Sequence, residues 1–194
     1  MVEAARGPGR PPSGARERVL EAALEVLKAD GYAGLTTAKV AARSGQNKAL
    51  IAYHFGSKQG LVAAASREIS ESITAEVVTS VESTETVEDI VRGVLAGVWR
   101  VLERDERLAR VYFDLAAAAV AEPEARAVMQ EARALWRRTL GQLLEDAGMP
   151  ATAAEAAAVS VIAAFDGLAL EWLDRGDTPA LGRARELAIR AIVG

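Results

Sequence analysis

Apolar residues recur every three or four positions along most of this 194-residue chain, and this spacing constrains the fold more than any other feature. Near the N-terminus the stripe contains Val19, Ala22, Ala23, Val26 and Leu27. Such a spacing places all the apolar side chains on one face of a helix. No run of alternating apolar and polar residues between turn residues indicates a strand. The sequence therefore predicts an all-α protein.

Capping and breaking residues give the expected helix boundaries. Ser13 is expected to cap the first helix and Gly31 to end it. A short helix follows from Thr36 or Thr37 to Ser44, and a second from Lys48 to His54. Longer helices are expected at 58–81, 87–104, 106–121, 124–147, 152–174 and 178–193, separated by Gly, Pro or polar residues.

Charge is distributed unevenly along the chain. Residues 1–60 hold nine Lys and Arg against five Asp and Glu, whereas residues 61–194 hold fourteen against twenty-two. No acidic residue lies between Asp30 and Glu68, and the cations within that window are Lys39, Arg43, Lys48, Lys58 and Arg67. A basic window without acids favours the approach of a polyanion, although Lys39 and Arg43 also fit a role as plain solvated charges.

Two short helices joined by a tight turn, after a longer first helix, are the layout of a helix-turn-helix unit. Gly45 can adopt the positive φ of such a turn, and Ala41 is small enough for the helices to cross closely. We therefore expect a DNA-binding domain at 13–60, preceded by a flexible basic arm at 1–12 and followed by a helical effector-binding and dimerisation domain at 61–194. The arm fits either a solvated tail or a segment that reaches the DNA minor groove.

The stretch TTAKVAARSGQNKALIAYHFGSKQGL, from Thr36 to Leu61, resembles the DNA-binding signature of the TetR family of transcriptional regulators. The shared features are the threonine at the start of the second helix, Ala41 and Gly45 at the turn, and the run YHFGSK at 53–58. The resemblance implies a repressor that a small-molecule effector releases from its operator. Its motif covers about a quarter of the chain, and the remainder agrees in length and helical pattern.

The resemblance also implies which side chains contact DNA. Thr36, Thr37 and Lys58 would bind phosphates, which position a protein without reading sequence. Asn47, Lys48 and Gln46 would read bases, since Lys donates to guanine and Asn or Gln pairs with adenine. Tyr53 and His54 look like contacts to the DNA backbone. Tyr53 could instead touch a thymine methyl, and His54 beside Phe55 also fits a simple packing role.

Two positions depart from the family pattern. The family usually has an apolar residue where Gln46 stands, so this side chain turns outward or the turn packs differently. It usually has Tyr where Ala52 stands, so one expected phosphate contact is missing, with Tyr53 as a candidate to compensate.

For the acidic part, the resemblance implies a helical bundle that encloses a ligand pocket and pairs with a second subunit. A homodimer on a palindromic operator is also expected because one short helix contacts too few bases. The pocket candidates, each of which also fits a core role, are Trp99, Tyr112, Phe113, Met129, Trp136, Phe165 and Asp166. The dimer candidates are Ile162, Phe165, Leu168, Trp172 and Leu187. Few polar groups interrupt these helices, so the expected effector is apolar or amphipathic.

Other classes of function find little support. The chain has no cysteine and a single histidine, His54, so thiolate and histidine-cluster metal sites are excluded and no cofactor is expected. The sequence contains no nucleophile motif and no Gly-rich phosphate loop of the kind that would indicate an enzyme. The N-terminus lacks an apolar segment and no spanning helix is expected, so we place the protein in the cytoplasm. A constitutive DNA binder or a protein-binding adaptor remains the alternative.

Overall fold

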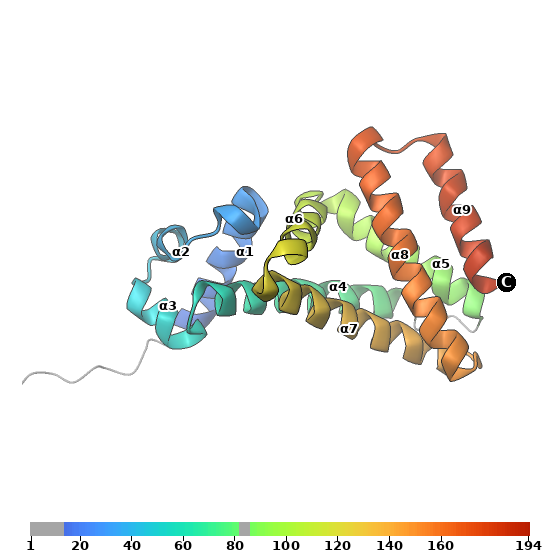
Figure 1. The fold of residues 1–194 in the computed structure, drawn as a ribbon, viewed down its shortest axis with the longest axis horizontal. Helices are drawn as coiled ribbons and strands as arrows, with labels where there is room; N and C mark the ends of the chain where they lie inside the picture. The colour runs from blue at the N-terminus through green and yellow to red at the C-terminus, as the bar shows by residue number, and fades with distance from the viewer. Residues whose placement is uncertain (1–13, 82–85) are drawn as a thin grey trace, which may run out of the picture. The chain divides into compact units, whose positions relative to one another are not determined.

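The computed structural model describes residues 14–81 and 86–194, and within these ranges the chain is helical without a strand (Figure 1). The all-α prediction is confirmed. The expected arm at 1–12 and the capping Ser13 lie outside the described residues. The helices are α1 (Ala15–Gly34), α2 (Thr37–Ser44), α3 (Lys48–Phe55), α4 (Lys58–Val81), α5 (Val87–Arg104), α6 (Arg107–Ala121), α7 (Pro123–Asp146), α8 (Ala151–Arg175) and α9 (Pro179–Val193).

Local chemistry explains where these helices begin. Pro123 and Pro179 are the first residues of α7 and α9, where a missing N–H costs nothing because the first turn has no acceptor for it. The hydroxyl of Thr178 accepts a hydrogen bond from the Leu181 N–H at 3.1 Å and caps α9. The backbone of α1 breaks at Gly31 (φ 71°, ψ −177°), where its end was expected, and the chain then makes one more helical turn.

The chain divides into two compact units, with the division between Ser66 and Arg67 inside α4. The first unit contains α1, α2, α3 and the start of α4. Each helix supplies side chains to one small core, and the residues at 0–1% exposure are Ala15, Val19, Ala23, Leu27, Leu35, Val40, Ile51, Leu61, Val62 and Ala65. Burial of these side chains holds the short helices α2 and α3 in place, since helices of eight residues are not stable alone.

The second unit contains the rest of α4 and α5 to α9 around a larger core. Within it, α5 packs closely on α4. A Cβ at Gly93 would lie 2.5 Å from Val81 Cγ1, and one at Gly97 would lie 3.2 Å from Val77 Cγ2. Glycine at these two positions, one turn apart, therefore allows the close approach of the two helices.

Helix α8 is long and apolar, with a mean hydropathy of 1.6 over an 18-residue window, and by length and composition it could cross a membrane. Core helices of bundles pass the same test. Ala154, Ala158 and Ala169 of α8 are fully buried, and the helix packs against α7 and α9. Alanine accounts for much of this hydropathy, and small side chains suit close helix packing.

Candidate nucleic-acid interface and effector site

The turn between α2 and α3 is short and tightly bonded. Gly45 ends α2 with φ 67° and ψ 16°, a left-handed conformation that glycine adopts at no steric cost. Asn47 then caps α3, because its Oδ1 accepts a hydrogen bond from the Leu50 N–H at 2.8 Å. Thr36 caps α2 in the same way, accepting from the Lys39 N–H at 3.2 Å. These bonds build a helix-turn-helix from the residues that the sequence indicated.

The outer face of α3 is open to solvent. Ile51 is 1% exposed and anchors the inner face, whereas Tyr53 is 73% exposed. The other exposed residues at the start and along the outer face are Asn47, Lys48, Ala49 and Ala52. Because the Oδ1 atom of Asn47 is used by the cap, its Nδ2 group is the part left to bind another molecule.

Gln46 lies differently from the other proposed base readers. It is half-buried, and its Nε2 donates to the Ser44 carbonyl at 3.5 Å while its backbone N–H donates to Ser44 Oγ at 3.3 Å. The amide therefore bonds within the turn. This contact gives a physical reason why a polar residue is accepted where the family has an apolar one.

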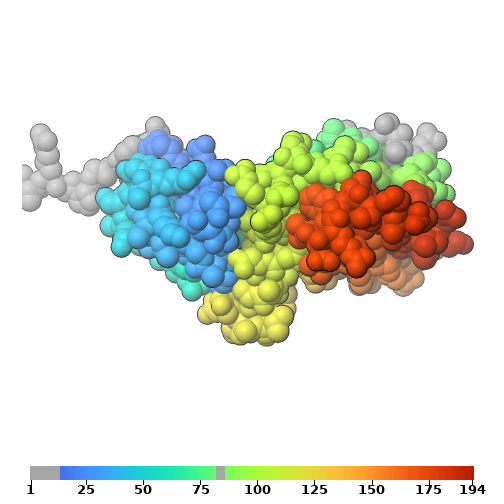
Figure 2. Space-filling view, turned by 90° about the horizontal axis from the view of Figure 1, so that it is seen from above, coloured from blue at the N-terminus to red at the C-terminus, as the bar shows by residue number. Residues whose placement is uncertain are grey.

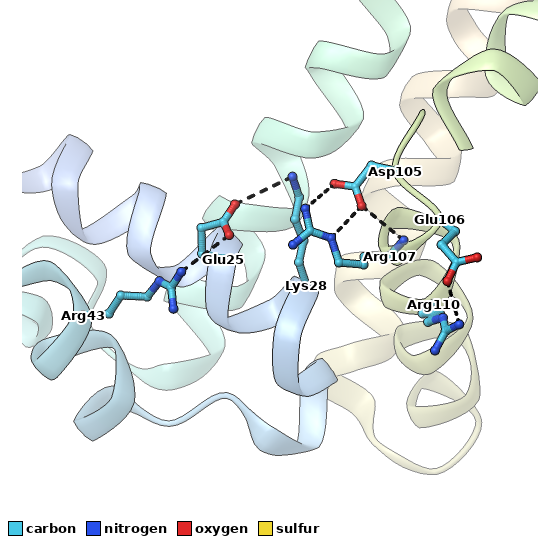
Figure 3. A network of polar contacts seen from close by, with 7 residues as sticks. All are labelled: Glu25, Lys28, Arg43, Asp105, Glu106, Arg107 and Arg110. Atoms are coloured by element: carbon cyan, nitrogen blue, oxygen red, sulfur yellow. Dashed lines mark hydrogen bonds and ion pairs between the residues drawn. The ribbon is translucent and has the colours of Figure 1, made fainter. Parts of the chain in front are cut away.

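Most cations near this surface already have partners within the first unit. Lys39 Nζ lies 2.9 Å from Asp30 Oδ2, and Arg43 Nη2 lies 3.6 Å from Glu25 (Figure 3). Lys58 Nζ lies over the ring of Tyr32, 5.1 Å from its centroid. Lys48, in contrast, forms no ion pair with any residue that the structure describes. A free ammonium at the exposed start of α3 is thus available to an anion or a base edge.

His54 is half-buried between its neighbours Tyr53 and Phe55, with ring centroids 5.1 and 6.3 Å away. Its Nε2 atom is shielded from solvent and has no hydrogen-bond partner among the described residues. A contact between this ring and a phosphate would therefore use Nδ1. Thr37, at the first position of α2, is half-buried, and Thr36 is exposed.

In the second unit, three helices bring a polar cluster together. The Tyr112 hydroxyl on α6 donates to Asp166 Oδ1 on α8 at 2.7 Å. Arg133 on α7 donates from Nε and Nη2 to the Tyr112 oxygen at 3.2 and 2.9 Å, and from Nη2 to Asp166 Oδ2 at 2.5 Å. We call Tyr112, Arg133 and Asp166 the polar triad. Sequence reasoning found two of its members but missed Arg133, which resembles the solvated arginines around it.

Aromatic rings surround the triad. The ring of Tyr112 lies 5.0 Å from Phe113, 5.6 Å from Trp136 and 6.1 Å from Phe165, measured between centroids. Tyr112, Phe113 and Trp136 are half-buried, so solvent reaches part of this cluster. Five of the seven pocket candidates are therefore neighbours in the structure.

The remaining two pocket candidates lie apart from that cluster. Trp99 on α5 packs edge-on against Trp172 of α8 at 5.8 Å, and the guanidinium of Arg185 lies 4.3 Å from its ring centroid. Met129 is 6% exposed on α7. The proposed pocket thus separates into a cluster around Tyr112, a second cluster around Trp99, and a buried methionine.

Burial raises the pKa of the Tyr112 phenol well above its ordinary value, and the bond to the Asp166 carboxylate raises it further. The nearby Arg133 opposes this shift but does not outweigh it. The phenol therefore keeps its proton at neutral pH. With one arginine cation and one carboxylate, the triad carries no net charge.

Comparison with known families decides the assignment. A model of the bacterial regulatory proteins of the tetR family matches residues 19–65, and one of the BetI-type transcriptional repressor C-terminal domain matches residues 83–194, more than half of the chain. The chain belongs to the TetR family of transcriptional regulators. It is a DNA-binding repressor with a BetI-type C-terminal domain.

Individual relatives agree with this assignment. This TetR-family protein is 27% identical to the HTH-type transcriptional regulator BetI of Stenotrophomonas maltophilia (strain R551-3) over 161 residues, covering 81% of the chain and 79% of the relative. A putative TetR-family regulator from Rhodococcus sp. shares the fold with a TM-score of 0.77 at 23% identity, covering 93% and 97% of the two chains. The multidrug binding protein EbrR, complexed with proflavin, has a TM-score of 0.67 at 27% identity, covering 91% and 98%.

The TetR-family protein buries part of the surface that was expected to pair with a second subunit. Phe165 is 9% exposed within the core of the second unit, and Leu168 and Trp172 pack against the same core. Ile162 is half-buried, and Leu187 is 64% exposed. The helical period indicated an apolar stripe on α8 correctly, but it did not distinguish the face that packs within the chain from the face left open.

The open face of α8 and α9 carries a different set of apolar side chains. Val159 and Leu170 on α8 are 48% and 52% exposed, and Leu187 on α9 is the third large apolar residue exposed there. Small residues Ala156, Ala163 and Gly167 are exposed on the same face of α8. These two helices pack side by side and form one surface of the second unit, orange to red in Figure 2.

The structure places no group of three or more His, Cys, Asp or Glu side chains close enough to hold a metal ion within residues 14–81 and 86–194. The acidic residues at the α5–α6 junction instead form ion pairs. Asp105 bonds Arg107 at 2.7 Å, and Glu106 bonds Arg110 at 2.8 Å (Figure 3).

Proposed function

We propose that this TetR-family repressor binds a palindromic operator as a homodimer and is released from it by a small molecule bound at the polar triad. The observation that carries the DNA-binding half of this proposal is the exposed face of α3. There Lys48, without an ionic partner among the described residues, is exposed to solvent, as are Asn47 and Tyr53. The protein acts by binding, carries no catalytic step, and works in the cytoplasm where its operator is.

The DNA contacts divide into two kinds. Thr36, Thr37 and Lys58 bind phosphates at the starts of α2 and α4, where the helix dipole already favours an anion. Lys48 and the Nδ2 group of Asn47 read base edges, and Tyr53 contacts the backbone or a thymine methyl. Gln46 supports the turn through its bond to Ser44, and His54 packs between Tyr53 and Phe55 while its Nδ1 faces a phosphate.

The second subunit packs on the open face of α8 and α9. Exposed Val159, Leu170 and Leu187 give this face its apolar side chains, and the small residues between them allow two helices to approach closely. A pair of these faces related by a two-fold axis forms a four-helix interface. The two-fold symmetry then matches a palindrome.

The effector acts through α4, which begins in the first unit and continues into the second. Within the second unit, Arg67 of α4 is ion-paired to Glu131 of α7, and Glu76 of α4 bonds Arg104 of α5 at 2.7 and 2.9 Å. Arg133 of the triad lies two residues beyond Glu131 on α7. A ligand that shifts α7 therefore shifts α4 and changes the separation of the two α3 helices. The structural relative EbrR, complexed with proflavin, supports a small-molecule effector for this fold.

Selection of binding sites from a randomised duplex library tests the proposal. The wild-type protein should enrich a palindrome at fixed salt. The Lys48→Ala, Tyr53→Ala double variant should lose that enrichment, and Arg138→Ala, which removes an exposed cation of α7, should keep it. Absence of enrichment by the wild type at low salt would favour a protein-binding adaptor. An operator complex that no small molecule releases would favour a constitutive DNA binder.

A further inference from the structure

Every acceptor oxygen of the polar triad already receives a hydrogen bond. Both carboxylate oxygens of Asp166 accept hydrogen bonds, one from Tyr112 and one from Arg133. The Tyr112 oxygen accepts from Arg133, and its single proton goes to Asp166. A donor group on a ligand would therefore have to share an oxygen that already accepts a hydrogen bond.

A donor without an acceptor lies beside the triad. The indole Nε1–H of Trp136 is buried and has no hydrogen-bond partner among the described residues. Its ring lies 5.6 Å from the ring of Tyr112, tilted by 38°. Buried N–H groups without partners are rare in native structures and call for a missing acceptor. The missing partner at this position is therefore an acceptor such as a carbonyl oxygen.

The charge of the cluster constrains the ligand further. Arg133 and Asp166 balance one another in a half-buried setting, with side-chain exposures of 36% and 23%. A cationic ligand would have to displace Arg133 from the carboxylate, and an anionic one would have to bind beside Asp166. Each leaves a partly buried charge uncompensated, which is unfavourable. An uncharged ligand disturbs neither member of the pair.

We infer that the effector site takes an uncharged, flat aromatic ligand whose carbonyl or similar oxygen accepts a hydrogen bond from Trp136 Nε1. The rings of Phe113, Trp136 and Phe165 around Tyr112 supply the faces and edges against which such a ligand stacks. The inference rests on the proposed function only in taking this cluster as the effector site.

Four probes that share one ring system test the ligand class by calorimetric titration of the full-length protein without DNA. They are 2-acetylnaphthalene, naphthalene, 2-naphthoate and 2-naphthylmethylammonium. The ketone should bind about tenfold more tightly than each of the others, the size of effect expected for one satisfied hydrogen bond or one uncompensated charge. Tighter binding of the anion or the cation, or no binding of any probe, would overturn the inference.

Two conservative variants locate the contact. Trp136→Phe keeps an aromatic ring but removes the N–H, so the ketone should bind roughly five- to tenfold more weakly while naphthalene is unaffected. Trp99→Phe is the matched control, because the Trp99 indole Nε1 is also buried without a partner but lies beside Arg185. Weaker ketone binding by Trp99→Phe instead, or unchanged binding by Trp136→Phe, would contradict the assigned contact.

The outcome is independent of operator binding. A ketone that binds as expected but does not release the operator would leave the ligand class standing and refute the effector role. Release of the operator by a charged compound bound at Trp136 would support the effector role and refute the ligand class.

Discussion

Replacement of Asp166 by alanine should destabilise the protein by about 2 kcal/mol. The substitution removes two hydrogen bonds to a charged group, from Tyr112 at 2.7 Å and from Arg133 at 2.5 Å. Bonds of this kind contribute about 1.5–3 kcal/mol each when buried. The Asp166 and Arg133 side chains are 23% and 36% exposed, so water replaces part of the loss, and we take about half of the full value.

Thermal unfolding of the free protein at fixed concentration measures this cost. For a chain of this size, a loss of about 2 kcal/mol lowers Tm by roughly 4–8 °C. Asp174→Ala on the same helix is the control, because that carboxylate is 77% exposed and its change should be within about 0.5 kcal/mol. Arg133→Ala and the double variant complete a double-mutant cycle. The loss of stability in the double variant should be about 1 kcal/mol smaller than the sum of the two single losses. Equal Tm values for Asp166→Ala and Asp174→Ala, or strictly additive losses, would refute the cooperative triad.

Three further perturbations test other parts of the structure. Gly93→Ala should destabilise the protein by about 1–2 kcal/mol, although alanine has the better helix propensity, since the new Cβ would lie 2.5 Å from Val81 Cγ1. An unchanged denaturant midpoint would show that α4 and α5 separate easily. Leu187→Glu should shift sedimentation towards the monomer because it places a charge on the open face of α9, whereas retained dimers would direct the interface elsewhere. Tyr112→Phe should lose less stability than wild type as pH rises above about 10. In the wild type, the raised pKa of the folded Tyr112 phenol contributes stability that is lost once the unfolded tyrosine ionises. Parallel curves of stability against pH for the two proteins would contradict this contribution.

The sequence predicted the helices well because their signals are local. Apolar periodicity, with breaks expected at the Gly-Ser pair 56–57 and at the polar residues Thr84 and Asp105, placed α4 and α5 at their observed bounds. The starts of α7 and α9 differ by one residue from the expected ones. Pro123 was expected to separate two helices but belongs to the first turn of α7, and Thr178 caps α9 instead of beginning it. The helix-turn-helix was recognisable because Gly45 and Asn47 act within a few residues of one another.

The sites were less predictable because they depend on partners far along the chain. Arg133 pairs with Asp166, 33 positions later, and nothing near it in the sequence distinguishes it from Arg137 and Arg138. Asp166 was identifiable as an acid on an otherwise apolar helix. Likewise, no local pattern shows that Lys39 and Arg43 are ion-paired while Lys48 is not. Helical period indicates that one face is apolar, and tertiary packing determines which neighbour covers it.

Binding of the selected operator to the protein, followed by fluorescence anisotropy across a salt series, tests the central claim most directly. Lys48 and Tyr53 act once in each half-site, so their replacement by alanine in both subunits should weaken binding by about a hundredfold or more, from roughly 1–3 kcal/mol for each base contact. The same variant should bind unrelated DNA nearly as the wild type does, with a smaller salt dependence. Equal operator affinity for the variant and the wild type would contradict the account, because the exposed face of α3 would then not read the DNA.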